Sequence, residues 1–284
     1  MFQDIHSTTK PFAGITVVFG GDFQQTLPVV INGTREDCIL ATVQRSILWN
    51  TIEVIHLQQN MRVQIDTNSR AFTQWLLDVG HGRPIPPQNS STSITIPDLM
   101  CCGTESDLIT SVYGSMSDHA QVPPPHFFAE RAILAARNDD IRSLNSTILD
   151  HLPGDERTYL SADSYSVENP TADEHHNIPL EFLHTLNASG LPIAKLHLKV
   201  GCPIILLRNV DPKRGLCNGT RATIVNMSNR LLEIRLLTGD HAGEIALIPR
   251  ITLSLTLTGL DFAIKLNRRQ FPIQLAFALT INKS

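Results

Sequence analysis

The stretch ITVVFGGDFQQTLPVV, residues 15–30, constrains the fold of this chain more than any other. It begins with an apolar, β-branched run, Ile15 to Phe19, that is typical of a strand covered on both faces. A glycine pair ends the run, and polar residues follow. Ligands of open α/β sheets bind beyond the carboxyl ends of such strands, so Gln25 is a candidate for ligand contact. The alternative is an ordinary polar residue that bonds to nearby backbone at the end of a strand.

The same pattern recurs three times, and helical patterns lie between the repeats. Strand-like runs at residues 52–57, 132–136 and 273–281 each end in polar or cationic residues. Strands that alternate with helices predict an α/β fold with a parallel sheet, so we expect the strand ends to share one edge. The expected helices are a segment that begins with a capping box of Thr34 and Asp37, residues 69–79, residues 105–113, and a segment capped by Asn138 whose buried face carries Ile141, Leu144 and Ile148.

From about residue 196 the period of the apolar residues changes from helical to alternating. Short alternating runs, separated by turn signals such as Asn218-Gly219, predict a small β-barrel. The α/β-like run at residues 273–281 follows them, so the barrel is expected to be an insertion. The strands expected for it are residues 203–207, 221–227, 232–236 and 244–248.

The charge and cysteine content narrow the range of partners. The chain of 284 residues carries 27 acidic and 23 basic residues, a net charge of −4, so a nucleic acid would have to be held by a local groove. Five cysteines without paired zinc spacing predict a reduced compartment and no metal site. No apolar run approaches a membrane span and no secretory signal is visible, so no membrane partner is expected. The late basic residues Lys265, Arg268 and Arg269 are interpreted as a solvated stretch.

Five segments in a fixed order make the chain resemble a known family. They are GGDFQQTLPV, LQQNMRV, AILAARNDDIRSLN, LKVGCPIILLRNVDPKRGLCNGTRATI and LAFALTINKS. Together they resemble the Pif-family DNA helicases of superfamily one, especially the versions carried by Helitron-type transposons. The resemblance spans essentially the whole chain.

The resemblance implies partial tandem RecA-like parallel-sheet domains with an inserted small SH3-like β-barrel. Three consecutive prolines, residues 123–125, mark the expected internal boundary. The implied parts are the end of a first RecA-like domain, the start of a second, the barrel, and a return to the second. Their expected ranges are residues 1–122, 126–195, 196–270 and 271–284.

The activity implied by the family is ATP hydrolysis coupled to 5′-to-3′ movement along single-stranded DNA and to duplex unwinding. ATP and Mg²⁺ are the implied cofactors, and single-stranded DNA is the implied partner. A nuclear location is expected, with the mitochondrion as the alternative, and roles in DNA repair, recombination and telomere maintenance go with the family.

Site residues are carried over by motif. Gln25, with Gln24 as the alternative, would sense the γ-phosphate and the attacking water near Asp22. Arg62 would be an arginine finger, although an exposed arginine alone is more often a surface ion pair. The residues expected along the DNA strand are Pro28, Asn138, Asn218, Gly219, Thr280 and Lys283.

The chain also departs from the family pattern. The 284 residues contain no Gly-Lys-Thr phosphate-binding loop, and no Asp-Glu pair precedes the strand-like run at residues 15–19, where the family pattern places the pair for the metal. We therefore expect the isolated chain not to turn over ATP. The alternative interpretation is a non-catalytic, decayed transposon copy that at most binds single-stranded DNA.

Overall fold

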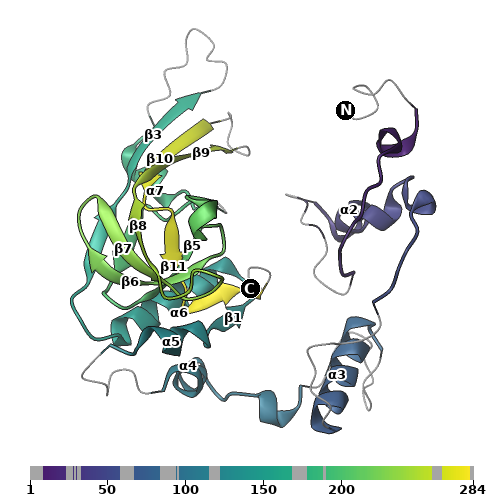
Figure 1. Ribbon diagram of the computed structural model, residues 1–284, viewed down its shortest axis with the longest axis horizontal. Coiled ribbons are helices and arrows are strands. Elements are labelled where there is room, and N and C mark those ends of the chain that lie inside the picture. Colours follow the sequence, from purple (N-terminus) through teal and green to yellow (C-terminus); the bar gives the residue numbers. More distant parts are fainter. Residues whose placement is uncertain are drawn as a thin grey trace. The chain divides into compact units, whose positions relative to one another are not determined.

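The computed structural model describes residues 9–23, 28, 30, 33–57, 67–83, 94, 96–114, 122–167, 178–187, 190–257 and 264–281. The chain divides into two compact units, Met1–Cys101 and Cys102–Ser284, which are considered separately (Figure 1). None of the helices in these described ranges has the length and apolar character needed to cross a bilayer. The finer division into four parts stays a prediction.

The first unit is helical where it is described. The predicted capping box is confirmed, because Thr34 N–H donates to Asp37 Oδ2 at 2.7 Å and Asp37 N–H donates to Thr34 Oγ1 at 3.2 Å. The bonds donated by the Thr34 backbone and side chain lower the pKa of Asp37. The predicted helix at residues 69–79 is also confirmed. The helices are α2 (Arg35–Leu40) and α3 (Thr67–Gly80), with 3-10 helices η1 (Pro11–Gly14), η2 (Val43–Arg45), η3 (Trp49–Thr51) and η4 (Asp98–Met100).

The two strands predicted for the first unit do not form. Residues 15–19 and 52–57 pair with no other segment of the described chain. Val18 is 91% exposed and Leu57 is 98% exposed, although both were expected to be covered. A strand requires a neighbour for its backbone groups, and the described part of this unit offers none.

The helices of the second unit include the two that the sequence predicted, at residues 105–113 and from residue 138 onward. They are α4 (Glu105–Tyr113), α5 (Pro125–Ala129), α6 (Asn138–His151), α7 (Leu180–Thr185) and the 3-10 helix η6 (Pro212–Arg214). Ile141, Leu144 and Ile148 are buried on α6, as predicted. The expectation that Asn138 caps this helix was wrong. The extended residue before α6 is Arg137, so Asn138 is the first helical residue and no side chain caps the end.

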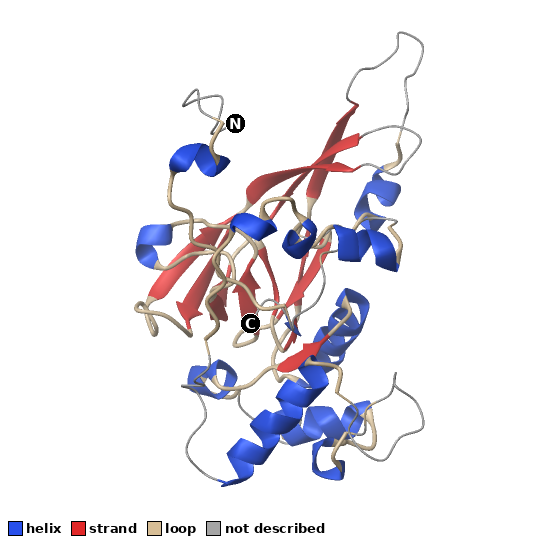
Figure 2. Cartoon of the chain, turned by 90° about the vertical axis from the view of Figure 1, so that its right-hand side faces the viewer, coloured by secondary structure: helices blue, strands red, loops and turns tan. Residues whose placement is uncertain are grey.

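All strands of the described chain belong to the second unit (red in Figure 2). β1 and β12 form a parallel pair, and β2 and β4 form an antiparallel pair. The remaining sheets are antiparallel, with strand orders β3-β10-β9 and β11-β5-β6-β7-β8. The strands predicted at 203–207, 221–227, 232–236 and 244–248 are β5 to β8, and closure of their sheet into a barrel stays a prediction. The bounds are β1 (Ile133–Ala135), β2 (Arg157–Leu160), β3 (Ala162–Val167), β4 (Lys195–Leu198), β5 (Pro203–Leu206), β6 (Arg221–Met227), β7 (Leu231–Leu236), β8 (Ile245–Pro249), β9 (Ile251–Leu257), β10 (Ile264–Gln270), β11 (Ile273–Leu275) and β12 (Ala278–Thr280).

The single strand predicted at residues 273–281 is two strands in two sheets. β11 pairs with β5 in antiparallel fashion, and β12 pairs with β1 in parallel fashion. The chain passes between the sheets at Ala276 and Phe277, both fully buried. A largely apolar run does not distinguish one strand from two, because most of its residues are covered in either case.

A continuous apolar core lies between α4, α5, α6 and the five-stranded sheet. Tyr113, Phe128 and Phe277 contact one another in it, and the Tyr113 hydroxyl donates to the Phe277 carbonyl. Burial raises the pKa of the Cys202 thiol to about 12, so this thiol is unreactive at neutral pH.

Candidate nucleic-acid interface

The parallel pair β1–β12 places two polar segments at one sheet edge. Ala135 lies opposite Thr280, so both strands end at the same level. β1 is followed by Arg137 and by Asn138, the first residue of α6. Because ligands of α/β proteins bind at the carboxyl ends of parallel strands, this edge is where a ligand is expected.

A cavity of about 430 Å³ runs beside α6 and includes this edge. Asn138 and Thr280 both line it. Neither side chain has a hydrogen-bond partner among the residues that the structure describes, so both are free to bind a ligand. The wall of α6 also contributes Ile141, Arg142, Asn145, Ser146, Leu149 and Asp150.

Asn145 fixes β12 against α6. Its Oδ1 accepts from Ala278 N–H at 2.8 Å, and its Nδ2 donates to the Ala278 carbonyl at 3.0 Å and the Leu275 carbonyl at 3.3 Å. Along a strand, the backbone N–H and carbonyl groups of successive residues point to opposite sides. Ile133 N–H donates to the Phe277 carbonyl, so the N–H and carbonyl of the next residue, Ala278, point away from β1. The Asn145 amide therefore binds the outward-facing backbone groups of β12 in the way that a neighbouring strand would. In doing so it holds β12, and with it Thr280, in position beside α6.

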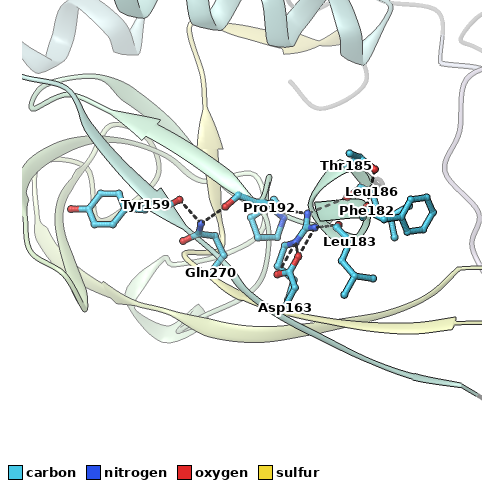
Figure 3. A network of polar contacts seen from close by, with 10 residues as sticks. Tyr159, Asp163, Phe182, Leu183, Thr185, Leu186, Pro192 and Gln270 are labelled. Atoms are coloured by element: carbon cyan, nitrogen blue, oxygen red, sulfur yellow. Dashed lines mark hydrogen bonds and ion pairs between the residues drawn. The ribbon is translucent and has the colours of Figure 1, made fainter. Parts of the chain in front are cut away.

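A loop after α7 forms another wall of the cavity, through Asn187, Gly190, Leu191 and Ile193. Arg268 of β10 is fully buried and holds this loop, because its guanidinium donates to the carbonyls of Leu186 and Pro192 at 3.1 Å each. It also donates to the Leu183 carbonyl at 2.7 Å and forms a forked ion pair with Asp163, the residue opposite it on β3 (Figure 3). The interpretation of Arg268 as a solvated residue was wrong.

Gln270, two residues further along β10, anchors the far end of the same loop. Its Nε2 donates to the Tyr159 carbonyl at 2.9 Å and to the Ala194 carbonyl at 3.3 Å (Figure 3). Arg268 and Gln270 are fully buried on the same side of β10, because side chains alternate along a strand. The loop wall is thus held from both ends by side chains that are themselves fixed.

Most charged side chains that line the cavity have a partner of opposite charge nearby. Arg142 forms an ion pair with Asp139, and His197 Nδ1 lies 2.6 Å from Glu156 Oε1. Asp150 adds a further carboxylate. The cavity lining itself therefore carries little uncompensated positive charge.

The Asn218-Gly219 turn is confirmed as a tight turn, with Gly219 at φ +90°. Asn209 Oδ1 accepts from Asn218 N–H at 2.8 Å, and Gly219 N–H donates to the Leu206 carbonyl at 2.8 Å. Both turn residues are exposed, and the Asn218 side chain has no partner among the described residues. The turn therefore presents polar groups to solvent close to the end of β5.

The remaining predicted site residues lie in the first unit, apart from Lys283. Asp22 and Pro28 are exposed in the first unit. Gln25 with its alternative Gln24, Arg62 and Lys283 lie outside the described residues, so their roles stay predictions. The described residues contain no group of three or more His, Cys, Asp or Glu side chains that could hold a metal ion.

Two family models match the chain. A PIF1-like helicase model matches residues 1–90, and a model of the 2B domain of DNA helicase Pif1 matches residues 181–227. The rat ATP-dependent DNA helicase PIF1 is 28% identical over 286 residues, which cover 99% of this chain and 36% of that protein. The ATP-dependent DNA helicase Pif1 of Bdellovibrio bacteriovorus is 27% identical over 282 residues, 99% of this chain and 52% of that protein. The chain spans about half the length of these relatives, or less.

Solved structures match the same fold. The Pif1 helicase from Bacteroides in complex with ADP-AlF3 and ssDNA gives a TM-score of 0.60 at 20% identity, over 100% of this chain and 56% of that chain. The Pif1 helicase from Candida albicans gives 0.58 at 22% identity, over 99% of this chain and 58% of that chain.

The fold is α/β, as the sequence predicted, and it matches the RecA-like fold of the solved Pif1 helicases. PIF1-like helicases are the proteins that the chain resembles, through two family models and through relatives of 27–28% identity that match 99% of its length. The narrower likeness to Helitron-borne versions stays a prediction.

Proposed function

We propose that this chain is part of an ATP-dependent DNA helicase that moves 5′ to 3′ along single-stranded DNA, and that its second unit binds the strand. One observation carries the proposal. Asn138 and Thr280, which the resemblance assigns to DNA contact, line the same cavity with free side chains, although 142 positions separate them in the sequence. Hydroxyl and amide groups at a strand end bind phosphate oxygens without reading base sequence.

The location of these groups supports a phosphate ligand. Thr280 lies at the end of a strand and Asn138 in the first turn of α6, where free backbone N–H groups favour an anion. Asp139 and Asp140 share this turn and oppose that attraction, and the ion pair with Arg142 offsets the charge of Asp139. Asn138 and Thr280 therefore contribute by hydrogen bonding more than by charge.

The described residues do not by themselves form a site for ATP or Mg²⁺. The chain lacks the Gly-Lys-Thr loop that would hold the β- and γ-phosphates, and no described group of side chains fits a metal ion. We propose that Gln25 and Arg62, with Asp22 nearby, contribute to an ATP site that other groups complete, and that the isolated chain does not hydrolyse ATP. A nuclear or mitochondrial location goes with this function.

Replacing Thr280 by valine tests the strand contact. Valine keeps the shape of threonine and removes the hydroxyl, so the dissociation constant for a fluorescent oligo(dT) should rise about fivefold, equivalent to about 1 kcal/mol. Fluorescence anisotropy at fixed salt measures it. Thr256→Val, at an exposed position of β9, is the matched control and should bind like the wild type. Equal affinities of the two variants would remove Thr280 from the interface, and a wild-type chain that binds no oligo(dT) would contradict the proposed function itself.

A further inference from the structure

Arg208 lies just beyond β5, and its guanidinium packs against the loop that forms a wall of the cavity. Its Nη2 atom lies 3.3 Å, and its Nη1 atom 3.6 Å, from the position that a Cβ on Gly190 would occupy. Gly190 has φ +81°, a conformation that residues with a Cβ rarely adopt. Glycine thus serves two purposes here, because it permits the turn and leaves room for the guanidinium.

Arg208 is half-buried and has no ion pair or hydrogen bond with any residue in the described part of the chain. Other arginines of the second unit that are at least partly buried have partners. Arg221 donates to the carbonyls of Phe128, Ala129 and Arg131, and Arg268 binds Asp163. A partly desolvated guanidinium without an anion is unfavourable unless a ligand supplies one.

The surroundings of Arg208 connect two groups of predicted DNA contacts. On one side, Gly190 lines the cavity that also contains Asn138 and Thr280. On the other side, the next residue, Asn209, holds the backbone of Asn218 in the exposed turn. Arg208 therefore lies between the cavity and the turn.

The loop against which the guanidinium packs is held in place before any ligand binds. The loop that carries Gly190 is held by Arg268 at Leu186 and Pro192 and by Gln270 at Ala194. A half-buried side chain packed against such a loop has less conformational freedom to lose on binding than an exposed side chain such as Arg137. Arg208 is thus better placed for a strong contact than the exposed cations nearby.

We propose that Arg208 binds a backbone phosphate of single-stranded DNA and so joins the contacts at Asn138 and Thr280 to those at the Asn218-Gly219 turn. The inference rests on the proposed function and adds a residue that the family resemblance did not assign to DNA contact. The arginines that line the cavity or lie behind its loop wall, Arg142 and Arg268, are already paired, so a phosphate there needs a further cation. A guanidinium supplies two parallel donors to phosphate oxygens, and such a contact is independent of base sequence.

The test measures oligo(dT) binding by anisotropy over a range of salt concentrations. Arg208→Ala should raise the dissociation constant about tenfold, and the slope of log affinity against log salt should fall in magnitude by about 0.7, the value for one lost phosphate contact on a single strand. Arg208→Lys keeps the charge, so its salt slope should match the wild type while its affinity falls less. Arg230→Ala, in the exposed turn between β6 and β7, removes the same charge and should leave the slope unchanged.

The outcomes separate the inference from the proposed function. A wild-type chain that binds oligo(dT), with Arg208→Ala showing the affinity and slope of Arg230→Ala, would overturn the role of Arg208 and leave the proposed function standing. If the wild type does not bind at all, the proposed function fails and the inference fails with it. If both Arg208 variants lose affinity with wild-type slopes, Arg208 acts through structure and not as a phosphate ligand. Circular dichroism of each variant confirms that it is folded.

Discussion

Replacing Arg268 by methionine is expected to lower the free energy of unfolding of the second unit by about 3–5 kcal/mol. The substitution leaves the buried carboxylate of Asp163 without its partner, and the carbonyls of Leu183, Leu186 and Pro192 lose their donor. Removing one member of a buried ion pair costs more than the pair contributes, because the remaining charge is neither solvated nor compensated. Urea unfolding followed by far-UV circular dichroism measures the change. Tryptophan fluorescence does not, because the two tryptophans, Trp49 and Trp75, belong to the first unit.

The neighbouring residue provides a control for this prediction. Arg269 is also an arginine of β10, but it is exposed on the opposite side of the strand. Arg269→Met should change the unfolding free energy by less than about 0.5 kcal/mol. The double variant Arg268→Met with Asp163→Leu should recover part of the loss, because it removes the stranded charge. If Arg268→Met unfolds at the same urea concentration as Arg269→Met, the buried network does not stabilise the unit.

Replacing Asn145 by leucine is expected to cost about 2–4 kcal/mol of the same free energy. Leucine fills a similar volume, but it leaves the N–H and carbonyl of Ala278 and the carbonyl of Leu275 without their partner. Ala278 is fully buried, so water does not replace the lost bonds. Buried polar groups left unsatisfied lose their hydration without compensation.

The position of β12 should change with the same substitution. Because Asn145 holds β12 against α6, Asn145→Leu should also weaken oligo(dT) binding by displacing Thr280. Asn226→Leu, at an exposed position of β6, is the matched control and should cost less than about 0.5 kcal/mol. Native stability in Asn145→Leu would mean that the edge of β12 does not depend on this amide.

Helices were predictable from the sequence because their signals are local. The capping box of Thr34 and Asp37 begins α2, and the apolar stripe of Ile141, Leu144 and Ile148 marks the buried face of α6. The short strands β5 to β8 were also predictable, because alternation and turn residues separate them. The cap of α6 was assigned one residue late, within the usual uncertainty of a helix end.

The residues that hold the cavity together had weaker signals. Asn145 lies four residues after Ile141, so a polar residue interrupts an otherwise apolar stripe. Arg268 and Gln270 follow Leu266 in the buried phase of an alternating strand. Such interruptions indicate buried polar networks, but their partners, such as Asp163, come from distant parts of the chain. Sequence periodicity reports which residues are buried and not what they contact.

The strands expected in the first unit show a different limit. Residues 15–19 have the composition of a covered strand, yet they are exposed and unpaired within the described chain. Composition predicts the capacity of a segment to form a strand, whereas the strand itself depends on a neighbour. In the second unit the predicted run at residues 132–136 did find its partner, β12, and became β1.

Hydrogen–deuterium exchange of the chain with and without oligo(dT) tests the DNA interface most directly. With oligo(dT) bound, exchange should be slower in the first turn of α6, at residues 190–194, at residues 207–220 and at the end of β12, because these segments surround the cavity, Arg208 and the exposed turn. The turn between β7 and β8, at residues 237–244, should exchange equally fast in both states. Protection confined to that turn, or no protection at α6 and β12 under conditions where the oligonucleotide is bound, would contradict the proposed interface.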